Sequence, residues 1–201
     1  PTVSAPSTRT ETVTTTEALE ALAARLAVAP AVALRTFTAG DRARTGELVG
    51  LALSTGGGEA WYLPLGHRYL GAPRQLDAAQ VAGRLQPLLE DAALPKYGHD
   101  LKADYLALRT LGVTLRGLAC DVELASYLLN AARREHALSD LARERLNCEL
   151  PADVRLPGGK KRPASDAPVP EGAAFVGACA DATHALAQAL MPELRAQGLE
   201  K

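Results

Sequence analysis

Residues 31–64 read AVALRTFTAGDRARTGELVGLALSTGGGEAWYLP. This stretch contains three short apolar segments, 31–38, 47–54 and 59–64. Turn-forming residues separate them, with Gly40 and Asp41 in the first break and three glycines in the second. Such spacing is typical of an antiparallel meander. Residues 48–53 of the middle segment are LVGLAL, and a run without polar residues predicts a strand that is buried on both faces.

Helical periodicity begins on both sides of the meander. On the N-terminal side, Thr14 and Glu17 have the spacing of a capping box, and leucines then recur on one face until Pro30 ends the helix. On the C-terminal side, Asp77 can cap the first of several helices. The elements predicted there are helices over 77–91, 101–112, 121–130, 138–147 and 172–190, and a short strand over 94–98. A meander followed by crossover helices predicts an α/β fold with a mixed sheet and helices packed on it, as in ribonuclease-H-like folds.

The chain is expected to form one domain with a connecting segment at each end. Its 201 residues, 47% of them hydrophobic, fit a single core. Residues 1–14 are rich in Thr, Ser and Pro, which predicts a linker. The domain is expected over 15–198, and 199–201 are expected to begin a connection to a further domain. Within the domain, 151–171 contains five prolines and a Gly-Gly-Lys-Lys-Arg run, which predicts an exposed loop.

Charge, cysteine content and hydropathy exclude several classes of protein. Lys and Arg number 22 and Asp and Glu 23, a formal charge of −1, so any contact with nucleic acid would have to be local. The cysteines are far apart, at Cys120, Cys148 and Cys179, which argues against a disulfide framework and a structural zinc site. No apolar run approaches the roughly 20 residues that a bilayer requires. We therefore expect a monomeric cytoplasmic protein without a membrane partner.

Two sequence motifs are specific enough to indicate a family. One is GHDLKADY at 98–105, and the other runs from DVELASYLLN at 121–130 to HALSDLA at 136–142. In order and spacing they resemble the 3′→5′ exonuclease domain of bacterial DNA polymerase I, a family A polymerase, and a looser similarity extends over about 11–194. The resemblance implies the DnaQ-like exonuclease form of the ribonuclease-H-like fold. It also implies a parent DNA polymerase of bacterial replication and repair, whose polymerase domain would follow this one.

The resemblance implies positions for metal-binding carboxylates, and most of these positions hold other residues. Exonucleases of this kind hydrolyse phosphodiesters with two divalent metals, which need several converging carboxylates. In the first motif, Arg35 and Phe37 occupy the two acidic places. In the third motif, Phe175 and Cys179 replace a tyrosine and an aspartate. In the second motif, Asp104 matches a metal-ligating acid.

One carboxylate is too few to hold two metals, and Arg35 adds electrostatic repulsion to the lost ligation. We therefore expect no catalytic residue, metal or cofactor in this chain, and we interpret Asp104 as vestigial. Burial of Phe37 in the former cleft is expected to contribute roughly 1.5–3 kcal/mol to stability. The predicted role is structural support of the polymerase domain of the same chain. That domain, the enzyme of the parent, would supply the contact with DNA and the need for Mg²⁺.

Two other functions remain as alternatives. One is an active, metal-dependent exonuclease that recruits other carboxylates. Its candidate ligands are Asp41, Asp100 and Asp181. The other is a non-catalytic module that binds nucleic acid or protein. For this function the basic run in the predicted loop, at Lys160, Lys161 and Arg162, offers contacts to phosphates, although the near-neutral charge argues against tight binding of DNA.

Overall fold

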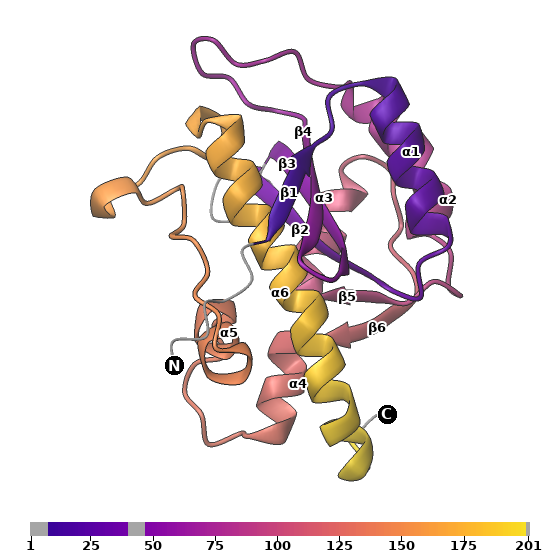
Figure 1. Ribbon diagram of the computed structural model, residues 1–201, viewed down its shortest axis with the longest axis vertical. Helices are drawn as coiled ribbons and strands as arrows, with labels where there is room; N and C mark the ends of the chain where they lie inside the picture. Colours follow the sequence, from indigo (N-terminus) through magenta and orange to yellow (C-terminus); the bar gives the residue numbers. More distant parts are fainter. Residues whose placement is uncertain (1–7, 40–46, 200–201) are drawn as a thin grey trace.

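The computed structural model describes residues 8–39 and 47–199, and its centre is one six-stranded sheet (Figure 1). The strands are β1 (Arg9–Thr12), β2 (Val32–Ala39), β3 (Glu47–Gly56), β4 (Glu59–Pro64), β5 (Lys96–Gly98) and β6 (Leu118–Asp121). Their order across the sheet is β1-β4-β3-β2-β5-β6. The predicted meander is confirmed, because β2, β3 and β4 pair antiparallel and β3 is buried from Leu48 to Ser54. The pairings of β1, β5 and β6 are parallel, so the sheet is mixed.

Helices cover both faces of this sheet. They are α1 (Thr16–Ala27), α2 (Ala78–Leu89), α3 (Leu101–Arg109), α4 (Val122–Leu129), α5 (Leu138–Leu146) and α6 (Val169–Ala196), with two short 3₁₀ helices, η1 (Pro157–Gly159) and η2 (Ala164–Asp166). On one face α1, α2 and α3 form a core with β2, β3 and β4. On the other face α4, α5 and α6 pack together, and α6 crosses the sheet (Figure 1). None of the described helices has both the length and the hydropathy needed to cross a membrane.

The predicted helices are all present, and their caps explain where two of them begin. The side chain of Asp77 accepts hydrogen bonds from the backbone N–H groups of Ala79 (2.9 Å) and Gln80 (3.1 Å), which confirms it as the N-cap of α2. The predicted capping box is wrong. Thr15, not Thr14, caps α1, so Glu17 stands one position too early to return a hydrogen bond to the cap.

The predicted linker is also wrong for residues 9–13. Arg9–Thr12 form β1, which pairs with β4, and Val13 is fully buried. The polar stretch is ordered because α6 lies close against it. A side chain at Gly177 of α6 would place its Cβ 2.2 Å from the Thr10 hydroxyl, so the glycine leaves room for this strand. Residues 1–7, 200 and 201 of the predicted connecting segments lie outside the described part of the chain.

The predicted loop at 151–171 is shorter and better packed than expected. It ends where α6 begins, at Val169, because helical structure continues through the proline-containing first turn. Ala164 and Ala167 are buried against the sheet. The ring Nδ1 of His67 lies 2.7 Å from the carbonyl oxygen of Ala167. The backbone N–H of Arg68 donates a hydrogen bond to the carbonyl oxygen of Ser165 at 2.8 Å. These contacts fix the C-terminal part of the loop on the sheet.

A glycine in β3 has a strict steric requirement that mutation can test. A Cβ at Gly50 would lie 2.1 Å from the hydroxyl of Tyr62, which is fully buried and hydrogen-bonded to His67. We expect Gly50→Ala to lower the free energy of unfolding by about 1–3 kcal/mol through overpacking. Gly83→Ala, at an exposed and open position of α2, is expected to raise it by about 0.5–1 kcal/mol. Urea unfolding of both variants measures the two changes in the free energy of unfolding, which should have opposite signs. An unchanged free energy of unfolding in Gly50→Ala would contradict the fixed position of Tyr62.

Candidate functional site

The candidate site lies where β2 and β5 separate. The last parallel pair between the two strands is Ala33 with Tyr97. Beyond this pair β5 ends at Gly98, and the first turn of α3 takes its place beside β2. Thr36 is therefore paired with β3 on one side and faces α3 on the side where β5 has ended. The carboxyl ends of parallel strands are the usual place for a site in an open α/β sheet.

Asp104 enters this gap from α3. Its side chain is almost completely buried, at 1% exposure. Oδ1 accepts hydrogen bonds from the backbone N–H of Thr36 (2.8 Å) and from its hydroxyl (2.6 Å), whereas Oδ2 has no hydrogen-bond partner among the described residues. Burial raises the pKa of Asp104 from 3.8 to about 6, against the opposing effects of Arg35 and Thr36. In this arrangement the carboxylate joins β2 to α3.

Arg35 brings a positive charge into the same region. Its Nη1 donates a hydrogen bond to the carbonyl oxygen of His99 at 2.5 Å. The guanidinium is also close enough to favour the anionic forms of Asp104, Asp153 and Cys179. A divalent cation placed among these groups would meet this guanidinium and be repelled by it. At the first position where the resemblance implies an acidic metal ligand, the side chain is thus of opposite charge.

The other altered positions lie in apolar surroundings. Phe37 is 3% exposed and packs with Val49 and Tyr62. Phe175 is partly buried between the two clusters that α6 forms with the sheet and with the neighbouring helices. Burial raises the pKa of the Cys179 thiol to about 11, so the sulfur is protonated at neutral pH. None of the side chains of Phe37, Phe175 and Cys179 offers an oxygen or thiolate ligand.

The residues present do not fit a pair of divalent metals. Within 8–39 and 47–199, no three His, Cys, Asp or Glu side chains lie close enough to hold a metal ion. The alternative ligands have other contacts: Asp100 caps the first turn of α3 (3.2 Å), and Asp181 accepts hydrogen bonds from Thr8 (3.0 Å) and Ser54 (3.2 Å). Asp41 lies outside the described residues.

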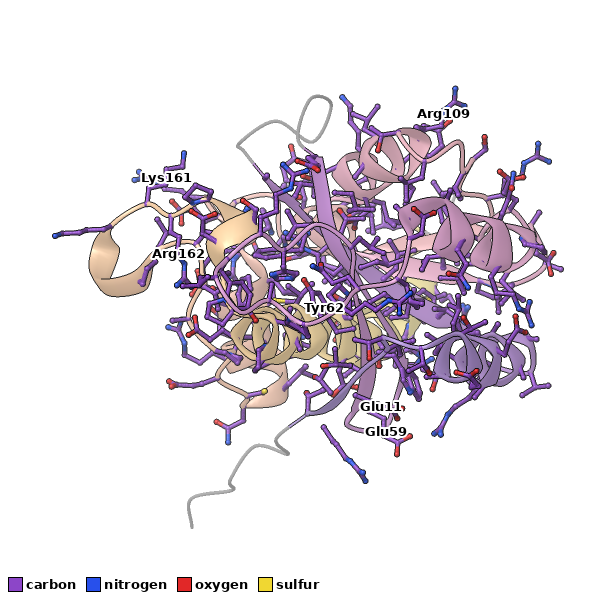
Figure 2. The ribbon with its side chains drawn as sticks, turned by 90° about the horizontal axis from the view of Figure 1, so that it is seen from above. Glu11, Glu59, Tyr62, Arg109, Lys161 and Arg162 are labelled. Atoms are coloured by element: carbon purple, nitrogen blue, oxygen red, sulfur yellow. The ribbon has the colours of Figure 1, made fainter. Side chains whose placement is uncertain are left out.

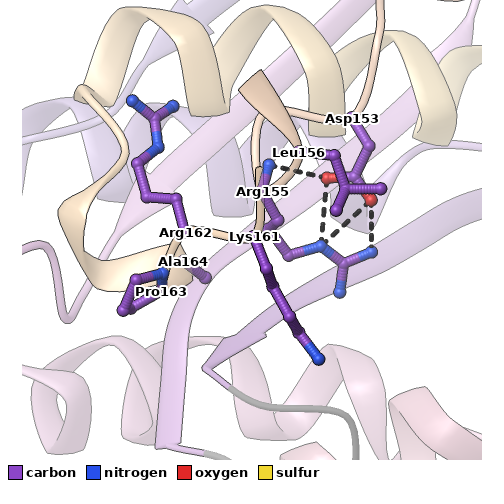
Figure 3. Close-up of a pocket in the computed structure, with 7 residues that line it drawn as sticks. All are labelled: Asp153, Arg155, Leu156, Lys161, Arg162, Pro163 and Ala164. Atoms are coloured by element: carbon purple, nitrogen blue, oxygen red, sulfur yellow. Dashed lines mark hydrogen bonds and ion pairs between the residues drawn. The ribbon is translucent and has the colours of Figure 1, made fainter. Parts of the chain in front are cut away.

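A cavity of about 590 Å³ opens in the loop that precedes α6, next to the candidate site. The two arginine side chains in its lining form hydrogen bonds with neighbouring residues. Arg155 donates to both carboxylate oxygens of Asp153 at 2.6–3.1 Å. Arg162 donates to the carbonyl oxygen of Val154 at 2.7 Å and to Glu171 at 2.8 Å. In Figure 3 the side chains of Arg155, Lys161 and Arg162 point in different directions.

The predicted nucleic-acid contacts are therefore spread out rather than gathered around one point. Arg162 donates a hydrogen bond back to the carbonyl oxygen of Val154 in the same loop. Lys161 lines the cavity, and Lys160 is exposed outside the cavity lining. Figure 2 shows Lys161 and Arg162 on the loop at one edge of the molecule, across from Arg109. A role for these residues in binding nucleic acid stays a prediction.

Sequence reasoning missed three groups that organise the site: the side chain of Thr36, the carbonyl of His99 and the carboxylate of Asp153. A signal for Thr36 was present, because successive residues of a strand point to opposite faces. With Arg35 and Phe37 directed to one face, Thr36 has to face α3. Asp153 offers no such signal, since it lies in an irregular loop and is influenced by Arg35 only through the tertiary fold.

Comparison with known proteins identifies the family. Residues 10–195 match the family described as 3′-5′ exonuclease. The chain belongs to this 3′-5′ exonuclease family. DNA polymerase I of Pseudomonas aeruginosa is 34% identical over 176 residues, which cover 86% of this chain and 19% of that protein. The chain is thus homologous to the exonuclease region of DNA polymerase I, and it spans about a fifth of the length of the curated relatives it matches.

Two solved structures illustrate the shared fold. The Pol1 structure from M. smegmatis, in complex with DNA primer-template and dNTP, has a TM-score of 0.68 at 24% identity, over 96% of this chain and 29% of that one. Escherichia coli RNase D, an exoribonuclease involved in structured RNA processing, has a TM-score of 0.70 at 18% identity, over 94% of this chain and 46% of that one. The predicted DnaQ-like exonuclease fold is confirmed.

Proposed function

We propose that this member of the exonuclease family does not hydrolyse nucleic acid and that it supports a polymerase region within a longer DNA polymerase I chain. The observation that carries the proposal is the Arg35 guanidinium, which donates a hydrogen bond to the carbonyl oxygen of His99 and opposes the rise that burial causes in the pKa of the Asp104 carboxyl. Two-metal hydrolysis needs an anionic cluster to gather the cations before the phosphate binds. Here a fixed cation lies within the remaining acidic groups.

The second support for the proposal is that the groups of the former site now make structural contacts. Asp104 binds Thr36, Phe37 fills a core cluster, and Cys179 is buried as a neutral thiol. On this proposal the domain has no cofactor of its own, and Mg²⁺ and DNA are bound by the polymerase region. The alternative of an active exonuclease with other ligands lacks a converging set of carboxylates among the described residues.

The experiment is digestion of a 5′-labelled single-stranded oligonucleotide by the 201-residue chain in Mg²⁺ and in Mn²⁺. We expect no shortening of the labelled strand with either metal. The matched variant is Asp104→Ala, which removes the one acid retained from the second motif. Shortening that disappears in Asp104→Ala would show that the chain cuts DNA at this site and would overturn the proposal.

A further inference from the structure

The outer face of α4 is apolar, which is unusual for a helix on the surface of a domain. Leu124, Tyr127 and Leu128 are 61%, 52% and 47% exposed. Their spacing of three and four residues places them on one side of the helix, while Val122 and Ala125 are buried on the other side. A surface helix normally turns charged or polar side chains to water, so a stripe of large apolar residues there indicates a partner.

The apolar surface continues from α4 onto the edge of the sheet. Leu118 of β6 is 51% exposed, and β6 is the last strand in the sheet order, so one side of its backbone has no strand partner among the described residues. A groove of about 510 Å³ lies between α3 and the β6–α4 segment, with Tyr105 and Leu124 among its lining residues. We call the exposed residues Leu118, Leu124, Tyr127 and Leu128 the α4 face.

We propose that the α4 face is the surface on which the polymerase region of the longer chain packs; this rests on the proposed function. The domain accounts for 19% of DNA polymerase I from P. aeruginosa and for 29% of the matched M. smegmatis chain, so most of such a protein lies outside it. A partner in the same polypeptide has a high effective concentration and needs only a modest apolar contact to stay docked.

The position of α6 favours this occupant over others. The C-terminal part of α6 packs beside α4, with Leu194 and Ala125 in one hydrophobic cluster (Figure 1). A chain that continues past α6 therefore leaves the domain beside α4, the helix that carries the α4 face. The charged residues along the groove are Lys102 and Asp121, and Glu123 lies on α4, so the surface lacks the positive charge that DNA phosphates would require.

Cysteine labelling tests the proposal in the long chain itself. Leu124→Cys is introduced in a Cys148→Ser background, both in the 201-residue chain and in the longer polymerase chain that the proposal assigns to it. Background labelling within the 201 residues is slow, because burial raises the thiol pKa of Cys120 and of Cys179 to about 11. We expect maleimide to react with Leu124→Cys at least about tenfold more slowly in the polymerase chain.

The control is Leu70→Cys, at a fully exposed leucine in the segment between β4 and α2, which is expected to react at the same rate in both chains. Leu128→Cys is a second reporter on the α4 face. Equal rates for Leu124→Cys in the two chains would overturn the docking surface. So would protection that grows with the concentration of the 201-residue chain, which would mean a second copy, or protection that requires added DNA. The nuclease assay is independent of these results, so the proposed function and the docking surface can fail separately.

Discussion

Replacing Phe37 with aspartate is expected to lower the free energy of unfolding by about 3–5 kcal/mol. Phe37 is 3% exposed and packs in one cluster with Val49, Ala52 and Tyr62. The substitution removes the aromatic packing and leaves a cavity, and it also places a charge among apolar side chains. The resemblance implies an acid at this position, so the result would show whether a carboxylate is still tolerated there. Denaturant unfolding at pH 7 gives the measurement.

Two related variants separate the causes of this loss. Phe37→Leu keeps an apolar side chain of moderate size and is expected to cost less than about 1.5 kcal/mol. Phe175→Asp introduces the same charge at a second altered position that is only partly buried, and it is expected to cost less than Phe37→Asp. If Phe37→Asp were as stable as the parent chain, the site would still accept a carboxylate, and the interpretation of Phe37 as a core residue would be wrong.

The central part of the fold could be predicted because its signals are local. The run at 48–53 marks the buried strand β3, and the glycines between β3 and β4 mark the turn. Asp77 and Asp121 accept hydrogen bonds from the first turns of α2 and α4, as their positions before apolar periodic segments suggest. Patterns of this kind depend on neighbours in the sequence, so one sequence is enough to read them.

The edge strands could not be predicted because their stability comes from distant residues. β1 has the sequence RTET, which contains no apolar residue, and it is held by pairing with β4 and by the space at Gly177. β6 has four residues and lies against β5. Short strands with weak patterns become ordered through tertiary packing, and propensity does not reveal that packing.

The sequence motifs proposed residues for the candidate site but could not give the contacts between them. The motifs singled out Arg35, Phe37 and Asp104, and the fold brings Arg35 and Asp104 within electrostatic reach. The spacing could not show that Thr36 satisfies Asp104 or that Asp153 approaches Arg35. These contacts depend on where β2 and β5 separate and on the path of the loop before α6.

Asp104→Asn is expected to stabilise the protein more at pH 7 than at pH 4. The pKa of Asp104 rises from 3.8 to about 6 in the folded state, chiefly because the group is buried. A carboxyl with a raised pKa gives its full contribution to stability below the unfolded value and loses it as the pH rises through the folded value. The difference between the folded and unfolded pKa values of Asp104 corresponds to a loss of about 3 kcal/mol of stability at neutral pH. Asparagine has no proton to lose, so the variant avoids this cost.

The comparison across pH is decisive because steric effects of the substitution do not change with pH. The amide oxygen of asparagine can accept the same hydrogen bonds from Thr36, and Oδ2 has no partner among the described residues to lose. The gain of Asp104→Asn over the parent chain, from urea unfolding, should therefore grow between about pH 4 and pH 6 and level off above it. Thr36→Val removes a hydroxyl donor that favours the ionised form of Asp104. In that background the pH at which the gain levels off should be higher. A gain that stayed constant from pH 4 to pH 7 would mean that Asp104 ionises in the folded protein without the cost that its burial implies.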